Sequence, residues 1–77
     1  MSSWTFETFE KPHETNEGWY YFAEYRWNKG GAYAVHVGLA KNGVEQYQLF
    51  NNFYADKEGA KRAFKRQIKK IERGDYQ

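Results

Sequence analysis

Over the middle of the chain, apolar side chains fall at every second position in three consecutive runs. The runs cover residues 19–27, 33–39 and 44–53, and they are rich in aromatic and β-branched residues. Alternation with a period of two is typical of strands that bury one face. The pattern therefore predicts three antiparallel strands within residues 18–54.

Two short turns separate these runs, Lys29-Gly30-Gly31 and Lys41-Asn42-Gly43. Each fits a three-residue hairpin loop, because glycine accepts the left-handed conformation that such a loop ends on. In the second hairpin this length pairs Val37 with Tyr47 and Val35 with Leu49. A two-residue Asn42-Gly43 loop would move every side chain of the third strand to the other face. We therefore predict the three-residue loop.

In this register one face of the sheet collects nearly every large apolar side chain, as a half-buried sheet requires. The opposite face is mixed, with three aromatic rings, small central residues and a polar row of Glu24, His36 and Gln48. Exposed aromatic rings on a sheet can stack on unpaired bases or anchor a protein partner. Cover by the N-terminal segment or by a second copy in a homodimer is the alternative. The candidate binding residues of this outer sheet face are Tyr20, Phe22, Arg26, His36, Gln46, Gln48 and Phe50.

After the third strand the apolar period changes from two to that of a helix. Asp56 is a favourable N-cap, and Gly74 stands where a left-handed C-cap is expected. We predict a helix over residues 56–73 that packs one narrow apolar stripe on the apolar sheet face. The stripe consists of Ala60, Phe64, Ile68 and Ile71.

The N-terminal segment, residues 1–17, leaves two interpretations open. Its first ten residues alternate in the manner of an edge strand, but a loosely ordered terminus held by Trp4 fits as well. The predicted fold is α+β: a three- or four-stranded antiparallel meander with one C-terminal helix on one face. We expect residues 1–77 to form a single domain.

Composition narrows the function classes. The chain has 77 residues and no cysteine, which excludes disulfides and thiolate metal sites and favours a reducing, cytoplasmic location. No apolar run approaches the roughly 20 residues of a membrane span, and the N-terminus lacks a signal-peptide pattern. We expect no membrane association.

The net charge of +2 hides a strong asymmetry. Residues 1–56 carry four basic and seven acidic side chains, whereas residues 57–73 carry eight basic and two acidic ones. Such a stripe is typical of nucleic-acid binding, but it also suits an acidic protein partner or a merely solvated face. Six side chains on the solvent side of the predicted helix are the candidate binding residues: Lys61, Arg62, Lys65, Arg66, Lys69 and Lys70.

Catalysis finds little support in the sequence. Glu24 beside His36 could form an acid–base pair, but the two serines, Ser2 and Ser3, are terminal and no cysteine nucleophile exists. Two distant histidines make no metal-ligand spacing, and the turn glycines match no phosphate-binding loop. We predict a non-enzymatic module with no cofactor, no metal and no small-molecule substrate.

A meander followed by a packed helix resembles, in architecture, the small DNA-binding domains at the N-termini of some phage and transposon integrases. The run from Phe53 to Ala60 is similar to their strand-to-helix junction. The resemblance implies DNA contact through the outer sheet face, but Arg26 is the only arginine there. The basic helix and the outer sheet face together give the hypothesis of a nucleic-acid-binding module. The alternative is a protein-interaction module, such as a regulator or inhibitor from a phage or mobile element, that docks through the aromatic outer sheet face or the basic helix.

Overall fold

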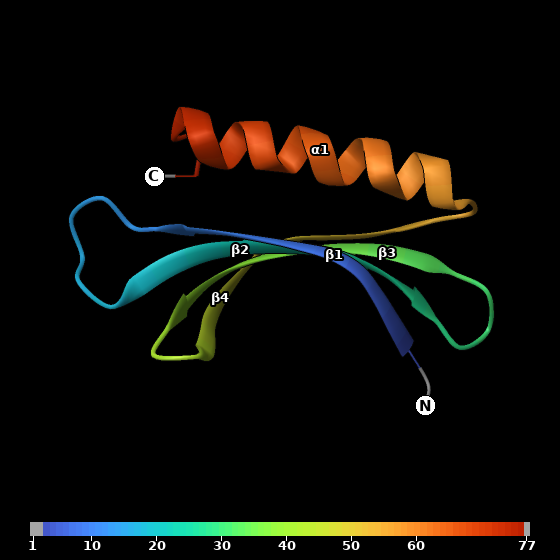
Figure 1. Cartoon of the computed structure of the whole chain (residues 1–77), viewed down its shortest axis with the longest axis horizontal. Coiled ribbons are helices and arrows are strands. Elements are labelled where there is room, and N and C mark those ends of the chain that lie inside the picture. The colour runs from blue at the N-terminus through green and yellow to red at the C-terminus, as the bar shows by residue number, and fades with distance from the viewer. Residues whose placement is uncertain (1–2, 77) are drawn as a thin grey trace.

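The computed structural model describes residues 3–76 as a four-stranded antiparallel sheet with one helix packed on it (Figure 1). The strands follow one another in space in the order β1-β2-β3-β4. This confirms the predicted α+β meander and supplies the fourth strand that the sequence left open. The elements are β1 (Ser3–Pro12), β2 (Trp19–Asn28), β3 (Tyr33–Lys41), β4 (Val44–Tyr54) and α1 (Lys57–Arg73).

β1 extends the sheet along the free side of β2 and does not fold over the outer face. It pairs with β2 from Ser3 opposite Asn28 onward, with a bulge between Thr5 and Glu7 that leaves Phe6 as the extra residue. A bulge bends its strand and re-aims a side chain. The rings of Phe6 and Phe9 pack against the core, whereas Trp4 is 65% exposed.

The core lies between α1 and the sheet. Phe64 of the helix is 1% exposed, and its ring centroid lies 4.9 Å from that of Tyr25 on β2. The alternating residues of β2 and β3 contribute the other half of this layer, as the period of two predicted. The buried cluster consists of Tyr21, Ala23, Tyr25, Val35, Val37, Ala60, Ala63, Phe64 and Ile71.

Both ends of α1 lie where the sequence predicted them. The carboxylate of Asp56 accepts a hydrogen bond from the N–H of Gly59 at 2.6 Å, which satisfies one of the orphan amides of the first turn. Gly74 has φ 80° and donates its N–H to the carbonyl of Ile71. Of the predicted stripe, Ile68 is only partly buried, whereas Gln67 beside the stripe is 4% exposed. The buried Gln67 amide oxygen accepts a hydrogen bond from the hydroxyl of Tyr76, which folds back past the helix end.

The first hairpin has the predicted register. Tyr21 pairs with Leu39 and Tyr25 with Val35, and the N–H of Asn28 donates to the carbonyl of Ala32 at 2.8 Å across the turn. The three-residue loop was therefore correct at this position.

The prediction for the second hairpin was wrong. Lys41 pairs with Val44, so Asn42 and Gly43 form a two-residue loop. Both residues have positive φ, 52° and 84°, as a type I′ turn requires. The loop that we rejected is the one that forms.

Two bulges on β4 explain how two of its aromatic residues still face the helix side despite this shorter loop. The ladder shifts once between Leu39 and Ala40 and again between Val37 and Gly38, and both extra residues lie on β4. After the first shift Tyr47 pairs with Leu39, and after the second Phe50 pairs with Val37, both on the helix side of the sheet. Each bulge moves the side chains that follow it to the opposite face of the sheet. Strict alternation along the sequence therefore could not reveal the true register.

The sheet curves away from the helix at both ends, so its outer face is concave (Figure 1). We call this face the concave surface; it carries the side chains of β2 and β3 that point away from α1. No helix in the described part of the chain is long and apolar enough to cross a membrane.

Candidate functional site

The six predicted basic side chains lie together along the solvent side of α1, and we call them the basic helix surface. Five of them are exposed and Lys61 is half-buried, whereas the buried residues of the helix fall on the opposite side. At 100° per residue the six occupy an arc of about 180°, and from first to last they span about 14 Å of the helix axis. The surface consists of Lys61, Arg62, Lys65, Arg66, Lys69 and Lys70.

These six charges are not neutralised within residues 3–76. The ion pairs of this part of the chain connect Lys11 with Glu14, Arg26 with Glu24, His36 with Glu45, and Arg73 with Asp75. None of them includes a member of the basic helix surface. The neighbouring Lys57 is engaged differently, because its ammonium lies 4.4 Å from the ring centroid of Phe6. The positive potential of the helix is therefore available to an external anion.

The concave surface is chemically different. It contains a hollow of about 260 Å³ whose walls come from β1, β2, β3 and the start of β4. Two half-buried aromatic rings and three carboxylates contribute to it, so the hollow combines apolar area with negative charge. The side chains concerned are those of Tyr20, Phe22, Glu10, Glu24 and Glu45.

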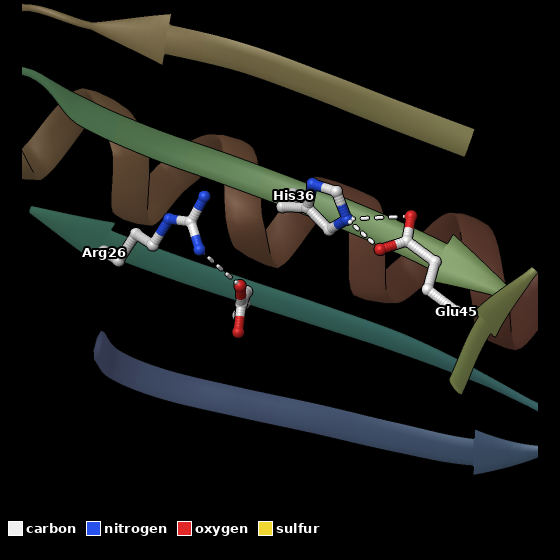
Figure 2. A network of polar contacts seen from close by, with 4 residues as sticks. Arg26, His36 and Glu45 are labelled. Atoms are coloured by element: carbon white, nitrogen blue, oxygen red, sulfur yellow. Dashed lines mark hydrogen bonds and ion pairs between the residues drawn. The ribbon is translucent and has the colours of Figure 1, made fainter. Parts of the chain in front are cut away.

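A polar network crosses this surface beside the hollow (Figure 2). The ring Nε2 of His36 lies 3.0 Å from both carboxylate oxygens of Glu45, and Arg26 donates to Glu24 at 3.2 Å. Glu24 does lie opposite His36 as predicted. His36 nevertheless pairs with Glu45 and not with Glu24, because the true register of β4 brings Glu45 to the concave surface.

Glu45 is the residue of this network that sequence reasoning missed. The signal was present in the Asn42-Gly43 dipeptide, which is the strongest short-range indication of a two-residue hairpin. With that loop, Glu45 lies opposite Ala40 on the concave surface. Without bulges, that loop would place Gln46 and Gln48 beside the apolar residues of β3, so alternation alone argues against it.

The other predicted outer-face residues divide into those that the structure brings together and those that it does not. Tyr20, Phe22, Arg26 and His36 belong to β2 and β3 and lie on the concave surface, and Gln48 lies opposite Gly38 on the same face. Phe50 was assigned wrongly: it pairs with Val37 and packs against the core on the helix side. Gln46 lies in the first bulge of β4 and pairs with no residue of β3.

The ring of Phe22 does not project from the concave surface but lies flat on it. It stacks on His36 with centroids 5.5 Å apart, and it covers Gly38 so closely that a Cβ there would lie 2.6 Å from two ring atoms. Glycine is therefore required at this position for packing, and no unusual backbone angle is involved.

Replacing Gly38 by alanine is expected to destabilise the protein by about 1–3 kcal/mol, the usual cost of overpacking. The free energy of unfolding from urea titration measures this. In a Phe22→Ala background the ring is absent, and the same substitution should cost less than about 1 kcal/mol. An equal cost in both backgrounds would show that Phe22 does not limit the space at Gly38.

The three tyrosines with shifted titration do not belong to either surface. Burial raises the pKa of Tyr21, Tyr25 and Tyr76, with smaller contributions from nearby carboxylates. Since these hydroxyls stay neutral in the folded protein at pH values where the unfolded chain ionises, stability falls only above a pH of about 10.

No group of three histidine, aspartate or glutamate side chains in residues 3–76 is placed to hold a metal ion. The hollow and the basic helix surface thus offer binding chemistry, namely hydrogen bonding, charge and aromatic contact. Comparison with protein-family models, with curated proteins and with solved structures found no match to this chain.

Proposed function

We propose that the protein is a non-enzymatic module that binds nucleic acid through the basic helix surface. The observation that carries this proposal is the set of six basic side chains on one side of α1, none of which is in an ion pair within residues 3–76. Phosphate contacts of this kind release condensed counterions, which supplies most of the affinity of sequence-independent binding.

The shape of the surface suits a duplex. The major groove of B-DNA admits an α-helix, and side chains at the two margins of a 180° arc can reach phosphates on both sides of a groove. Every member of the surface is lysine or arginine, and none is asparagine or glutamine, the side chains that read adenine. Lysine and arginine bind phosphates and can also pair with guanine in the major groove, so we infer binding that is driven mainly by the backbone charge.

The concave surface is left out of this proposal. The carboxylates of Glu10, Glu24 and Glu45 line its hollow and would repel phosphates. The proposal thus differs from the architectural resemblance to integrase domains, which implies contact through the sheet.

The test is a fluorescence-anisotropy titration with a duplex of about 20 base pairs at about 50 and 200 mM salt. Four to six phosphate contacts predict that the affinity falls by roughly 10²–10³-fold between these conditions. Absence of binding at the lower salt concentration, or binding that does not respond to salt, would contradict the proposal.

A protein-interaction module is the second candidate, favoured by the hollow of about 260 Å³ with its half-buried rings of Tyr20 and Phe22. Aromatic residues in a partly desolvated pocket are the usual anchors of protein interfaces. The two candidates use opposite faces of the molecule and can be separated. Binding that survives neutralisation of the basic helix surface but is lost on Tyr20→Ala would assign the function to the concave surface.

A further inference from the structure

β4 forms an edge of the sheet, and nothing in residues 3–76 pairs with its outer side (Figure 2). Residues 46–55 contain no charged side chain, although 29% of the chain is charged. Edge strands are normally protected from pairing with other chains by lysine, by proline or by bulges. β4 has only the last of these devices.

The bulges protect one half of the strand. The two register shifts fall before residue 50, and from Phe50 to Tyr54 the residues pair one to one with β3. This second half of β4 is therefore a regular strand with an unpaired edge. We call residues 50–54 the free edge.

The ladder determines which backbone groups of the free edge face outward. The two-residue turn closes with a hydrogen-bonded pair at Lys41, and such pairs alternate with non-bonded pairs along the ladder. Because both bulges lie on β4, the alternation along β3 is uninterrupted. Every second residue of β3 from Lys41 therefore faces β4, and the third one after Lys41 is Val35, whose partner is Asn52. The backbone N–H and C=O of Asn52 thus face β3, and those of Asn51 and Phe53 face away from it.

A hydrogen bond within β4 agrees with this assignment. The N–H of Phe53 donates to Oδ1 of Asn52 at 3.0 Å, so this amide is satisfied by a side chain of its own strand and not by β3. The bond keeps the edge amide occupied in a single copy. A neighbouring strand could replace it with a backbone carbonyl.

Exposed apolar area gathers on the same strand. Three of the four exposed large hydrophobic side chains in residues 3–76, Val44, Tyr47 and Phe53, belong to β4. Phe53 is 59% exposed and lies on the free edge itself, opposite the small buried Ala34. Pairing with another strand would cover this ring.

We propose that two copies of the protein associate through their free edges, antiparallel and centred on Asn52. In this register Asn51 of each copy exchanges both backbone hydrogen bonds with Phe53 of the other, which gives four bonds across the two-fold axis. Asn52 then lies opposite its own counterpart, where two amide side chains can donate and accept in turn. The two sheets join into one continuous sheet, a form of β-augmentation.

A second copy is the occupant that this chemistry favours. In an isologous interface both copies contribute the same surface. The free edge has no charged side chain, so it neither repels a second copy nor selects an oppositely charged partner. Its asparagine amides complement one another. The axis is perpendicular to the sheet, so both basic helix surfaces would lie on the same side of the dimer. The inference does not depend on the proposed function.

The test is sedimentation equilibrium without nucleic acid, so its outcome is separate from that of the nucleic-acid titration. A ladder of five residues is smaller than a standard interface, and we expect a dissociation constant on the order of 100 µM. The mean mass should rise from 9.2 kDa toward twice that value as the concentration increases. A monomeric mass up to about ten times that constant would overturn the proposal.

A matched pair of variants locates the interface. Phe53→Lys places a charge on the free edge and should abolish the mass increase. Val44→Lys adds the same charge at a position of the same strand that is 60% exposed but lies before the bulges, and it should leave the mass increase unchanged. Circular dichroism verifies that both variants are folded. Equal loss or equal retention of association in the two variants would contradict the proposed register.

Discussion

Replacement of Phe64 by alanine is expected to remove a large part of the stability of the fold. The side chain is 1% exposed and joins the helix to the sheet through the ring of Tyr25. Truncating a buried phenylalanine costs about 3–5 kcal/mol, because apolar contacts are lost and a cavity remains. A chain of this length has a total stability of only roughly 4–12 kcal/mol. Urea denaturation followed by tryptophan fluorescence gives the loss directly.

The matched control is Phe53→Ala, measured at a few micromolar protein, where we expect a monomer. It removes the same side chain from a position that is 59% exposed, and we expect a change within about 0.5 kcal/mol. If the two variants lost similar stability, the core would not lie between α1 and the sheet in the way described. A cost confined to Phe64 would agree with the single core layer of the structure.

The second large effect concerns affinity for nucleic acid. Changing Lys65, Arg66, Lys69 and Lys70 together to glutamine should lower the affinity for a duplex by roughly 10³-fold at about 0.1 M salt. The same variant should flatten the slope of log K against log salt by about 3.6, because each lost phosphate contact removes about 0.9. Its free energy of unfolding should not fall, since all four side chains are exposed and make no ion pair in the described residues.

Two double variants separate a local contact from a general loss of charge. Lys65→Gln with Lys69→Gln removes two charges from the basic helix surface. Lys29→Gln with Lys41→Gln removes two exposed charges, one from the first hairpin turn and one from the end of β3. The first pair should weaken binding by about 50-fold at 0.1 M salt and the second by no more than a few-fold. Similar losses would mean that the ligand responds to net charge and not to the helix.

The parts of the structure that the sequence predicted well are those that local chemistry determines. Asp56 and Gly74 cap the helix through groups within a few residues of themselves, and the Gly30-Gly31 turn fixes its hairpin without help from the rest of the fold. The basic helix surface follows from the helical period alone. Because each of these features depends only on residues close in sequence, it could be predicted without the tertiary structure.

The register of β4 could not be obtained in this way. The bulges beside Leu39 and Val37 return Tyr47 and Phe50 to the helix side. Phe50 packs there against the core, and that advantage exists only when the core is assembled. The cost of a local irregularity is then offset by tertiary burial. The error carried over to the site, where Glu45 was overlooked and Phe50 was placed on the wrong face.

The separation of charge across the sheet has a consequence for encounter with a polyanion. Basic groups lie on one side of the core and the carboxylates of the hollow on the other, so the molecule has a large electric dipole although its net charge is small. A field from phosphates exerts a torque on such a dipole before any contact is made and turns α1 toward the ligand. Productive collisions thus become more frequent than the net charge of +2 alone would suggest.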